Sequence, residues 1–223
     1  MNTIASKLLA TASLALVLGV SASLAQSISI TNSSFESNTG YNGGITSTIV
    51  GWTNQTPAYG DVSAVTSSFT SGLTGSNAIW LDGTISQLTA ATFTTGATYT
   101  LTIDVGNPAG VTTNVNGFQF GFRNAANTGF ITGTGQQFIN STTINSIADG
   151  TFQAFSVAYT AVVGDNGNSI RIGMTDFTGG GSATYRMDNV RLSASAIPEP
   201  STFSALAGLG VLSLAVTRRR RTT

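Results

Sequence analysis

The stretch TYTLTIDV, residues 98–105, alternates polar and apolar side chains at every step. Tyr99, Leu101, Ile103 and Val105 fall on one side of an extended chain, because successive side chains of a strand point to opposite faces. The threonines and Asp104 fall on the other side. This period of two predicts a β-strand with one buried face and one face in water.

The same period recurs through the middle of the chain. Apolar residues share one parity in GFQFGFR (117–123), FQAFSVAYT (152–160) and SIRIGM (169–174). Turn signals such as Asn116-Gly117 and Asp149-Gly150 separate the runs. No stretch between residues 27 and 197 sustains the 3.6-residue period of a helix. The pattern predicts one all-β domain over residues 26–195, an antiparallel β-sandwich.

The run TYRMDNVRL, residues 184–192, interrupts this alternation. Tyr185 and Met187 have one parity, whereas Val190 and Leu192 have the other. A single slipped residue is what a β-bulge produces, and bulges turn side chains into new directions. We therefore predict a bulge at Asp188-Asn189.

The composition limits the function. Residues 27–197 contain four arginines against eight carboxylates, which leaves no basic surface for nucleic acid. The chain has no Cys, so no disulfide stabilises it. It also has no His, which removes the commonest general base and metal ligand. We expect that the protein is not an enzyme.

The first residues have the pattern of a secretory signal peptide. Lys7 precedes an apolar run over residues 8–20, and the small residues Ser23 and Ala25 follow it. This order predicts a signal peptide over residues 1–25 that is cleaved before Gln26.

The last residues combine an uncharged run with a cluster of cations. Residues 201–217 carry no charge, and as a helix they would span about 26 Å, the lower limit for crossing a bilayer. Four arginines follow directly and would stay on the cytoplasmic side: Arg218, Arg219, Arg220 and Arg221. We predict a transmembrane helix over residues 201–217 with the preceding domain outside.

Pro198-Glu199-Pro200, the apolar run and the arginines stand in the order of a known sorting signal. Residues 196–223 resemble the PEP-CTERM signal of Gram-negative and related bacteria. The resemblance implies that an exosortase in the membrane cuts near Pro198, Glu199 and Pro200. It also implies that the exported protein is anchored transiently and then passed to the bacterial cell surface, the extracellular matrix or biofilm.

Several landmarks of the body follow a familiar order: Asn32-Ser33-Ser34-Phe35-Glu36, Gly51-Trp52-Thr53 and Asp188-Asn189-Val190-Arg191-Leu192. They resemble galactose-binding-like domains, the jelly-roll fold of many carbohydrate-binding modules. In several such modules the equivalents of Glu36 and Asp188 ligate a structural calcium ion. The alternative is that Asp188 binds neighbouring backbone at the bulge while Glu36 is solvated.

Aromatic residues near predicted loops suggest a sugar-binding platform. Trp52, Tyr41 and Tyr59 could stack on a sugar ring, although Trp52 could equally belong to the core. We expect a non-catalytic structural or adhesive component associated with exopolysaccharide. The alternative is a lectin-like carbohydrate-binding module with a specific glycan ligand, which would require these aromatic residues to be exposed together.

Overall fold

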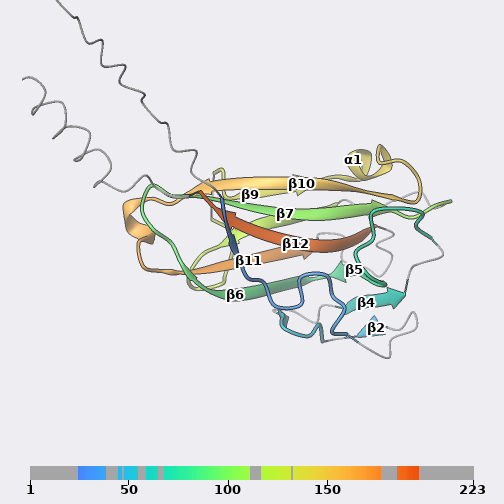
Figure 1. The fold of residues 1–223 in the computed structure, drawn as a ribbon, viewed down its shortest axis with the longest axis horizontal. Coiled ribbons are helices and arrows are strands. Elements are labelled where there is room, and N and C mark those ends of the chain that lie inside the picture. The colour runs from blue at the N-terminus through green and yellow to red at the C-terminus, as the bar shows by residue number, and fades with distance from the viewer. Residues whose placement is uncertain are drawn as a thin grey trace, which may run out of the picture. The chain divides into compact units, whose positions relative to one another are not determined.

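The computed structural model describes residues 25–38, 45–46, 48–54, 59–64, 68–110, 117–131, 133–176 and 185–195 (Figure 1). Residues 1–24 of the predicted signal peptide, Tyr41 and the whole segment 196–223 lie outside these ranges. The predicted membrane helix at 201–217 therefore lies outside them too. Within the described ranges, no helix has the length and apolar character needed to cross a membrane.

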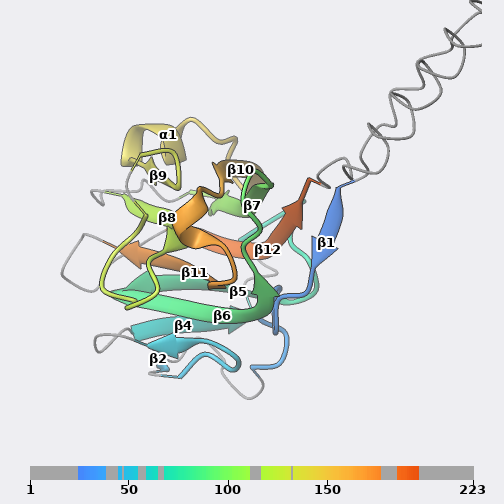
Figure 2. The same cartoon turned by 90° about the vertical axis from the view of Figure 1, so that its left-hand side faces the viewer.

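The described residues form two antiparallel sheets, which confirms the predicted all-β sandwich (Figures 1 and 2). The seven-stranded sheet has the order β10-β7-β12-β5-β4-β2, and β1 also pairs with β12. Its strands are β1 (Gln26–Ile28), β2 (Ile45–Thr46), β4 (Tyr59–Ala64), β5 (Asn77–Asp82), β7 (Thr98–Asn107), β10 (Thr151–Thr160) and β12 (Arg186–Ala194).

The five-stranded sheet has the order β3-β6-β11-β8-β9. Its strands are β3 (Thr53–Asn54), β6 (Thr84–Thr92), β8 (Phe118–Arg123), β9 (Gln136–Ile139) and β11 (Ser169–Asp176). A short helix, α1 (Ser141–Asn145), follows β9, and a 3₁₀ turn, η1 (Val163–Asp165), follows β10. Neither was expected from periodicity, because each is too short to show one.

The core consists of the apolar parities that the sequence predicts. Tyr99, Leu101, Ile103 and Val105 of β7 are all buried in the seven-stranded sheet. Phe118, Phe120 and Phe122 of β8 are buried in the five-stranded sheet and belong to the same core cluster. Side chains from both inner faces therefore fill one core, as in other sandwiches.

The predicted bulge in β12 is confirmed. The pairing of β12 with β7 shifts register between Asp188 and Arg191, and Asn189 has a φ of 51°. The extra residue restores the inward direction after the break, so residues of both parities reach the core. Tyr185 and Met187 before the bulge, and Val190 and Leu192 after it, are all buried.

We predict that Phe120→Ala lowers the free energy of unfolding by about 3–5 kcal/mol, because it empties a fully buried site. Urea denaturation would measure the loss. Phe138→Ala in the neighbouring strand β9 is the matched control, since Phe138 is 50% exposed and its loss should change stability by less than about 0.5 kcal/mol. Equal losses for the two variants would contradict the described packing.

Candidate functional site

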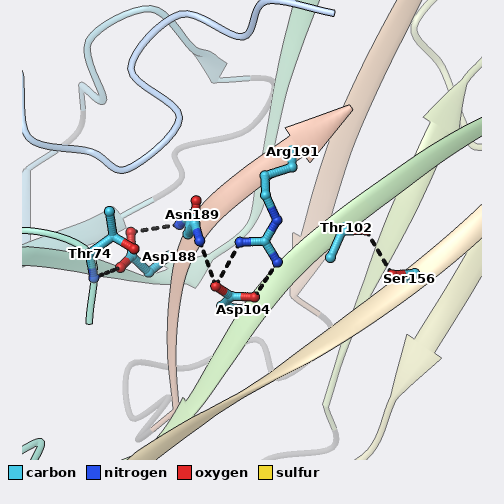
Figure 3. Close-up of polar contacts among 7 residues, drawn as sticks. All are labelled: Thr74, Thr102, Asp104, Ser156, Asp188, Asn189 and Arg191. Atoms are coloured by element: carbon cyan, nitrogen blue, oxygen red, sulfur yellow. Dashed lines mark hydrogen bonds and ion pairs between the residues drawn. The ribbon is translucent and has the colours of Figure 1, made fainter. Parts of the chain in front are cut away.

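Three carboxylates gather beside the β12 bulge: Glu36, Asp104 and Asp188. We call this group the β12 carboxylate cluster. Asp188 lies deepest and is fully buried. Its Oδ2 accepts a hydrogen bond from the Thr74 backbone N–H at 2.6 Å, and its Oδ1 accepts one from the Asn189 N–H at 2.6 Å. Figure 3 shows the Asp188 side chain turned toward Thr74.

Burial controls the ionisation of Asp188. Loss of water raises the pKa of its carboxyl to about 7. The N–H groups of Thr74 and Asn189 oppose this, because they favour the ionised form, whereas the charges of Asp104 and Glu36 raise the pKa further. Asp188 therefore exchanges a proton near neutral pH, unlike an ordinary surface aspartate.

Glu36 holds the same segment of chain from the other side. It is exposed, and its Oε1 accepts hydrogen bonds from the backbone N–H groups of Ser76 at 3.0 Å and Asn77 at 2.7 Å. Gly75 lies between the two contact points of these carboxylates and has a φ of 83°. Any side chain at Gly75 would collide with the Glu36 carboxylate. The two acids thus fasten residues 74–77 where they enter β5.

The placement of Glu36 and Asp188 fits only part of a calcium shell. Calcium needs six to eight oxygen ligands, and the Asp188 oxygens and Glu36 Oε1 face N–H donors, which cannot ligate a cation. No group of three or more acidic, His or Cys residues suited to a metal occurs within the described ranges. Asp188 does bind neighbouring backbone, as the alternative interpretation expected, and calcium stays a prediction.

Asp104 forms the outer part of the cluster on β7. Arg191 donates to both of its oxygens, from Nη2 to Oδ1 at 2.6 Å and from Nη1 to Oδ2 at 2.8 Å. The Asn189 side chain donates to Oδ2 at 2.8 Å, and Figure 3 shows it converging with Arg191 on Asp104. Further along β7, the Thr102 hydroxyl pairs with that of Ser156 on β10 at 2.7 Å. The sheet surface here is polar with its charges paired.

The aromatic residues expected in a sugar platform are placed differently. Trp52 is only 7% exposed and packs against Phe35 with ring centroids 5.9 Å apart, while its Nε1 donates to the Asn32 carbonyl. It therefore belongs to the core and offers no exposed face for a sugar ring. Tyr41 lies outside the described residues, and Tyr59 is described only as backbone in β4.

A pocket of about 350 Å³ opens beside the five-stranded sheet. The end of β8, the loop after it and the β10–β11 connection contribute most of its wall, and Phe93 after β6 completes it. Its lining includes Phe93, Arg123, Asn124, Phe130, Asp165 and Asn168. Arg123 lies in this wall and is only 6% exposed. No sequence pattern pointed to Arg123, because one arginine ending an alternating strand carries no local signal.

Two family models match successive parts of the chain. One, described as HpiC1-like (HpiC1 cyclase), matches residues 26–193. The chain belongs to the HpiC1-like cyclase family. A second, the PEP-CTERM protein-sorting motif, matches residues 196–221 and confirms the predicted sorting signal. This motif implies export, anchoring in the membrane and processing by exosortase.

Solved structures show a similar fold at low identity. An apo cyclase from Fischerella sp. is 21% identical with a TM-score of 0.60, covering 80% of this chain and 100% of its own. The Stig cyclase Fisc from Fischerella sp. TAU, in complex with (3Z)-3-(1-methyl-2-pyrrolidinylidene)-3H-indole, is 20% identical with a TM-score of 0.59, covering 78% and 100%. No curated protein sequence matches the chain.

A more distant likeness is to an arabinose-bound α-L-arabinofuranosidase, MgGH51. It is 12% identical with a TM-score of 0.51, and the match covers 78% of this chain and 27% of that one. These TM-scores show a similar architecture, and a similar architecture carries no activity by itself.

We predict that stability falls as the pH rises from about 4 to about 7, with Asp188 as the cause. In this interval Asp188 ionises in the unfolded chain, where its ordinary pKa is 3.8. In the folded chain it keeps the proton until about pH 7. The raised pKa therefore adds on the order of 4 kcal/mol to the free energy of unfolding at low pH. This contribution is lost as the pH rises through 7. Urea denaturation of the wild type and Asp188→Asn at several pH values would measure the difference.

Asp188→Asn has no proton to lose, so its stability should lack this component, and parallel curves for the two proteins would contradict the assignment. Calcium enters the same experiment, because a bound ion requires ionised ligands. If Glu36 and Asp188 hold calcium, Tm at neutral pH rises in calcium relative to EDTA for the wild type. It should not rise for Asp188→Asn or Glu36→Gln.

Proposed function

We propose that the protein works at the cell surface or in the extracellular matrix as a non-catalytic structural component associated with exopolysaccharide. The observation that carries this proposal is the direct succession of sandwich and sorting motif. Strand β12 ends at Ala194, and the sorting motif begins at residue 196. The cargo of the sorting signal is therefore the β-sandwich itself.

The state of Asp188 supports a structural role. It is the described carboxylate with a strongly raised pKa, yet it is fully buried and both its oxygens accept backbone N–H groups. A general acid must come within hydrogen-bond reach of its substrate. The geometry of Asp188 instead suits the fastening of residues 74–77 to the bulge.

We predict that sorting depends on the Pro-Glu-Pro motif and retention depends on polysaccharide. In a bacterium with an exosortase, the sandwich should appear in the surface or matrix fraction. Replacing Pro198, Glu199 and Pro200 together by alanine should leave the chain in the membrane fraction, because the processing site is lost. Immunoblots of cell fractions would measure this, and the same host without its exosortase is the control.

In a host that makes no exopolysaccharide, the processed sandwich should pass into the medium. Retention at the surface of that host would contradict the association with polysaccharide. Normal sorting of the alanine variant would contradict the role assigned to the motif.

A second candidate function is acid-catalysed cyclisation with Asp188 as proton donor. It is favoured by the family and by the pKa of about 7, since a general acid works best when its pKa lies near the working pH. This function requires residues 74–77 to move away and open Asp188 to a substrate.

The two candidates differ in their response to indole compounds. One cyclase from Fischerella sp. TAU was solved in complex with 4-(1H-Indol-3-yl)butan-2-one. We predict that calorimetric titration of this compound into the full chain detects no binding, because Asp188 is closed. Binding that Asp188→Asn alters, while the charge-matched Asp149→Asn does not, would favour the cyclase instead.

A further inference from the structure

Two arginines lie directly opposite each other on the outer face of the five-stranded sheet. Arg171 of β11 pairs in register with Arg123 of β8, and their charges interact. Like charges at facing positions of neighbouring strands are destabilising. Arg191 on the other sheet differs from them, because it forms an ion pair with Asp104. Within the described ranges, neither Arg123 nor Arg171 forms such an ion pair.

The structure fixes the position of Arg123. Its Nε donates to Asn127 Oδ1 at 2.7 Å, and one Nη donates to the Asn127 carbonyl at 3.0 Å. The guanidinium lies 5.0 Å from the centre of the Phe130 ring. Its stem passes over Gly173, where a side chain would occupy the same space. A guanidinium has five N–H donors, so Arg123 retains donors beyond the two that Asn127 receives.

Arg171 adds an unsatisfied donor beside it. Its Nε is buried and has no hydrogen-bond partner among the described residues. Buried polar atoms are almost always bonded, and an exception calls for an explanation such as a missing ligand. On the other side of Arg171, Leu88 of β6 is its register partner and is 52% exposed. One row across three strands thus contains an apolar side chain and two cations.

The adjoining pocket leaves room for a small ring. Its volume of about 350 Å³ lies at the lower end of the range for ligand pockets. Asp165 also lines it, but Asp165 Oδ2 already accepts hydrogen bonds from the Tyr159 hydroxyl and the Val162 N–H. Both donors are neutral, so the negative charge of Asp165 remains in this wall, and the positive charge of Arg171 remains without an ion-pair partner among the described residues.

We propose that Arg123 and Arg171 bind the anionic group of an acidic sugar, a carboxylate or a sulfate, and that the pocket lined by Arg123 receives its ring. Planar guanidinium groups match such oxyanions through paired N–H bonds. The inference rests on the proposed association with exopolysaccharide and specifies that this polysaccharide is acidic. An anion here neutralises the repulsion between the facing cations.

The test is calorimetric titration of the full chain, kept in nonionic detergent, with three oligosaccharides of equal length: a polyuronate, a sulfated glycan and a neutral glycan. We expect an acidic oligosaccharide to bind and the neutral one not to bind. Arg171→Gln should weaken binding about tenfold or more, as for loss of one charge-assisted hydrogen bond. Arg171→Lys should bind at an intermediate level, since lysine keeps the charge but loses the fork.

Arg191→Gln removes the same charge from the other sheet and should bind like the wild type. Arg171→Gln should melt at the wild-type temperature or above it, because it relieves repulsion, so weaker binding cannot be attributed to unfolding. Tighter binding of the polyuronate would identify the anionic group as a carboxylate, and tighter binding of the sulfated glycan would identify it as a sulfate. Equal binding of acidic and neutral glycans, or full binding by Arg171→Gln, would overturn the arginine site. Retention of the sandwich in hosts with and without exopolysaccharide tests the proposed function separately.

Discussion

The bulge at Asp188-Asn189 is the constraint on which the rest of the structure depends. A strand of strict alternation could not bury Tyr185 and Met187 together with Val190 and Leu192, yet all four lie in the core. One extra residue, with Asn189 at a φ of 51°, resolves this conflict. The same change of direction turns Asp188 inward to the Thr74 segment and leaves Asn189 facing Asp104. Packing and polar contacts therefore share one local distortion.

The chain has few charges, and their placement distinguishes the two sheets. On the seven-stranded sheet Arg191 and Asn189 satisfy Asp104, while backbone N–H groups satisfy Asp188. The partly exposed Arg191–Asp104 pair adds little stability, on the order of 1 kcal/mol or less. On the five-stranded sheet Arg123 and Arg171 repel each other. A fully satisfied polar network makes a fold more rigid, whereas an unpaired buried polar group is costly.

Sequence patterns predicted what depends on neighbouring residues and missed what depends on strand pairing. The strands at 98–107 and 118–123 follow from alternation, and the bulge follows from a slip in parity within one strand. The burial of Trp52 was left open, because a tryptophan after a glycine can end a strand on either side. Arg123 and Arg171 are far apart in sequence, and they meet only through the register of β8 with β11. No local pattern encodes that register.

Family membership and local geometry address different questions. The cyclase family accounts for the sandwich, because residues 26–193 match its model, but a fold does not carry a reaction. General acid catalysis needs an accessible acid, and both oxygens of the buried Asp188 accept hydrogen bonds from backbone N–H groups. A binding site needs donors held in place, and Asn127, Gly173 and Phe130 hold the largely buried Arg123 at the wall of its pocket. The proposed attachment to an acidic glycan needs only that Arg123 is held in place on one sheet, whereas the cyclase candidate needs Asp188 on the other sheet to be opened.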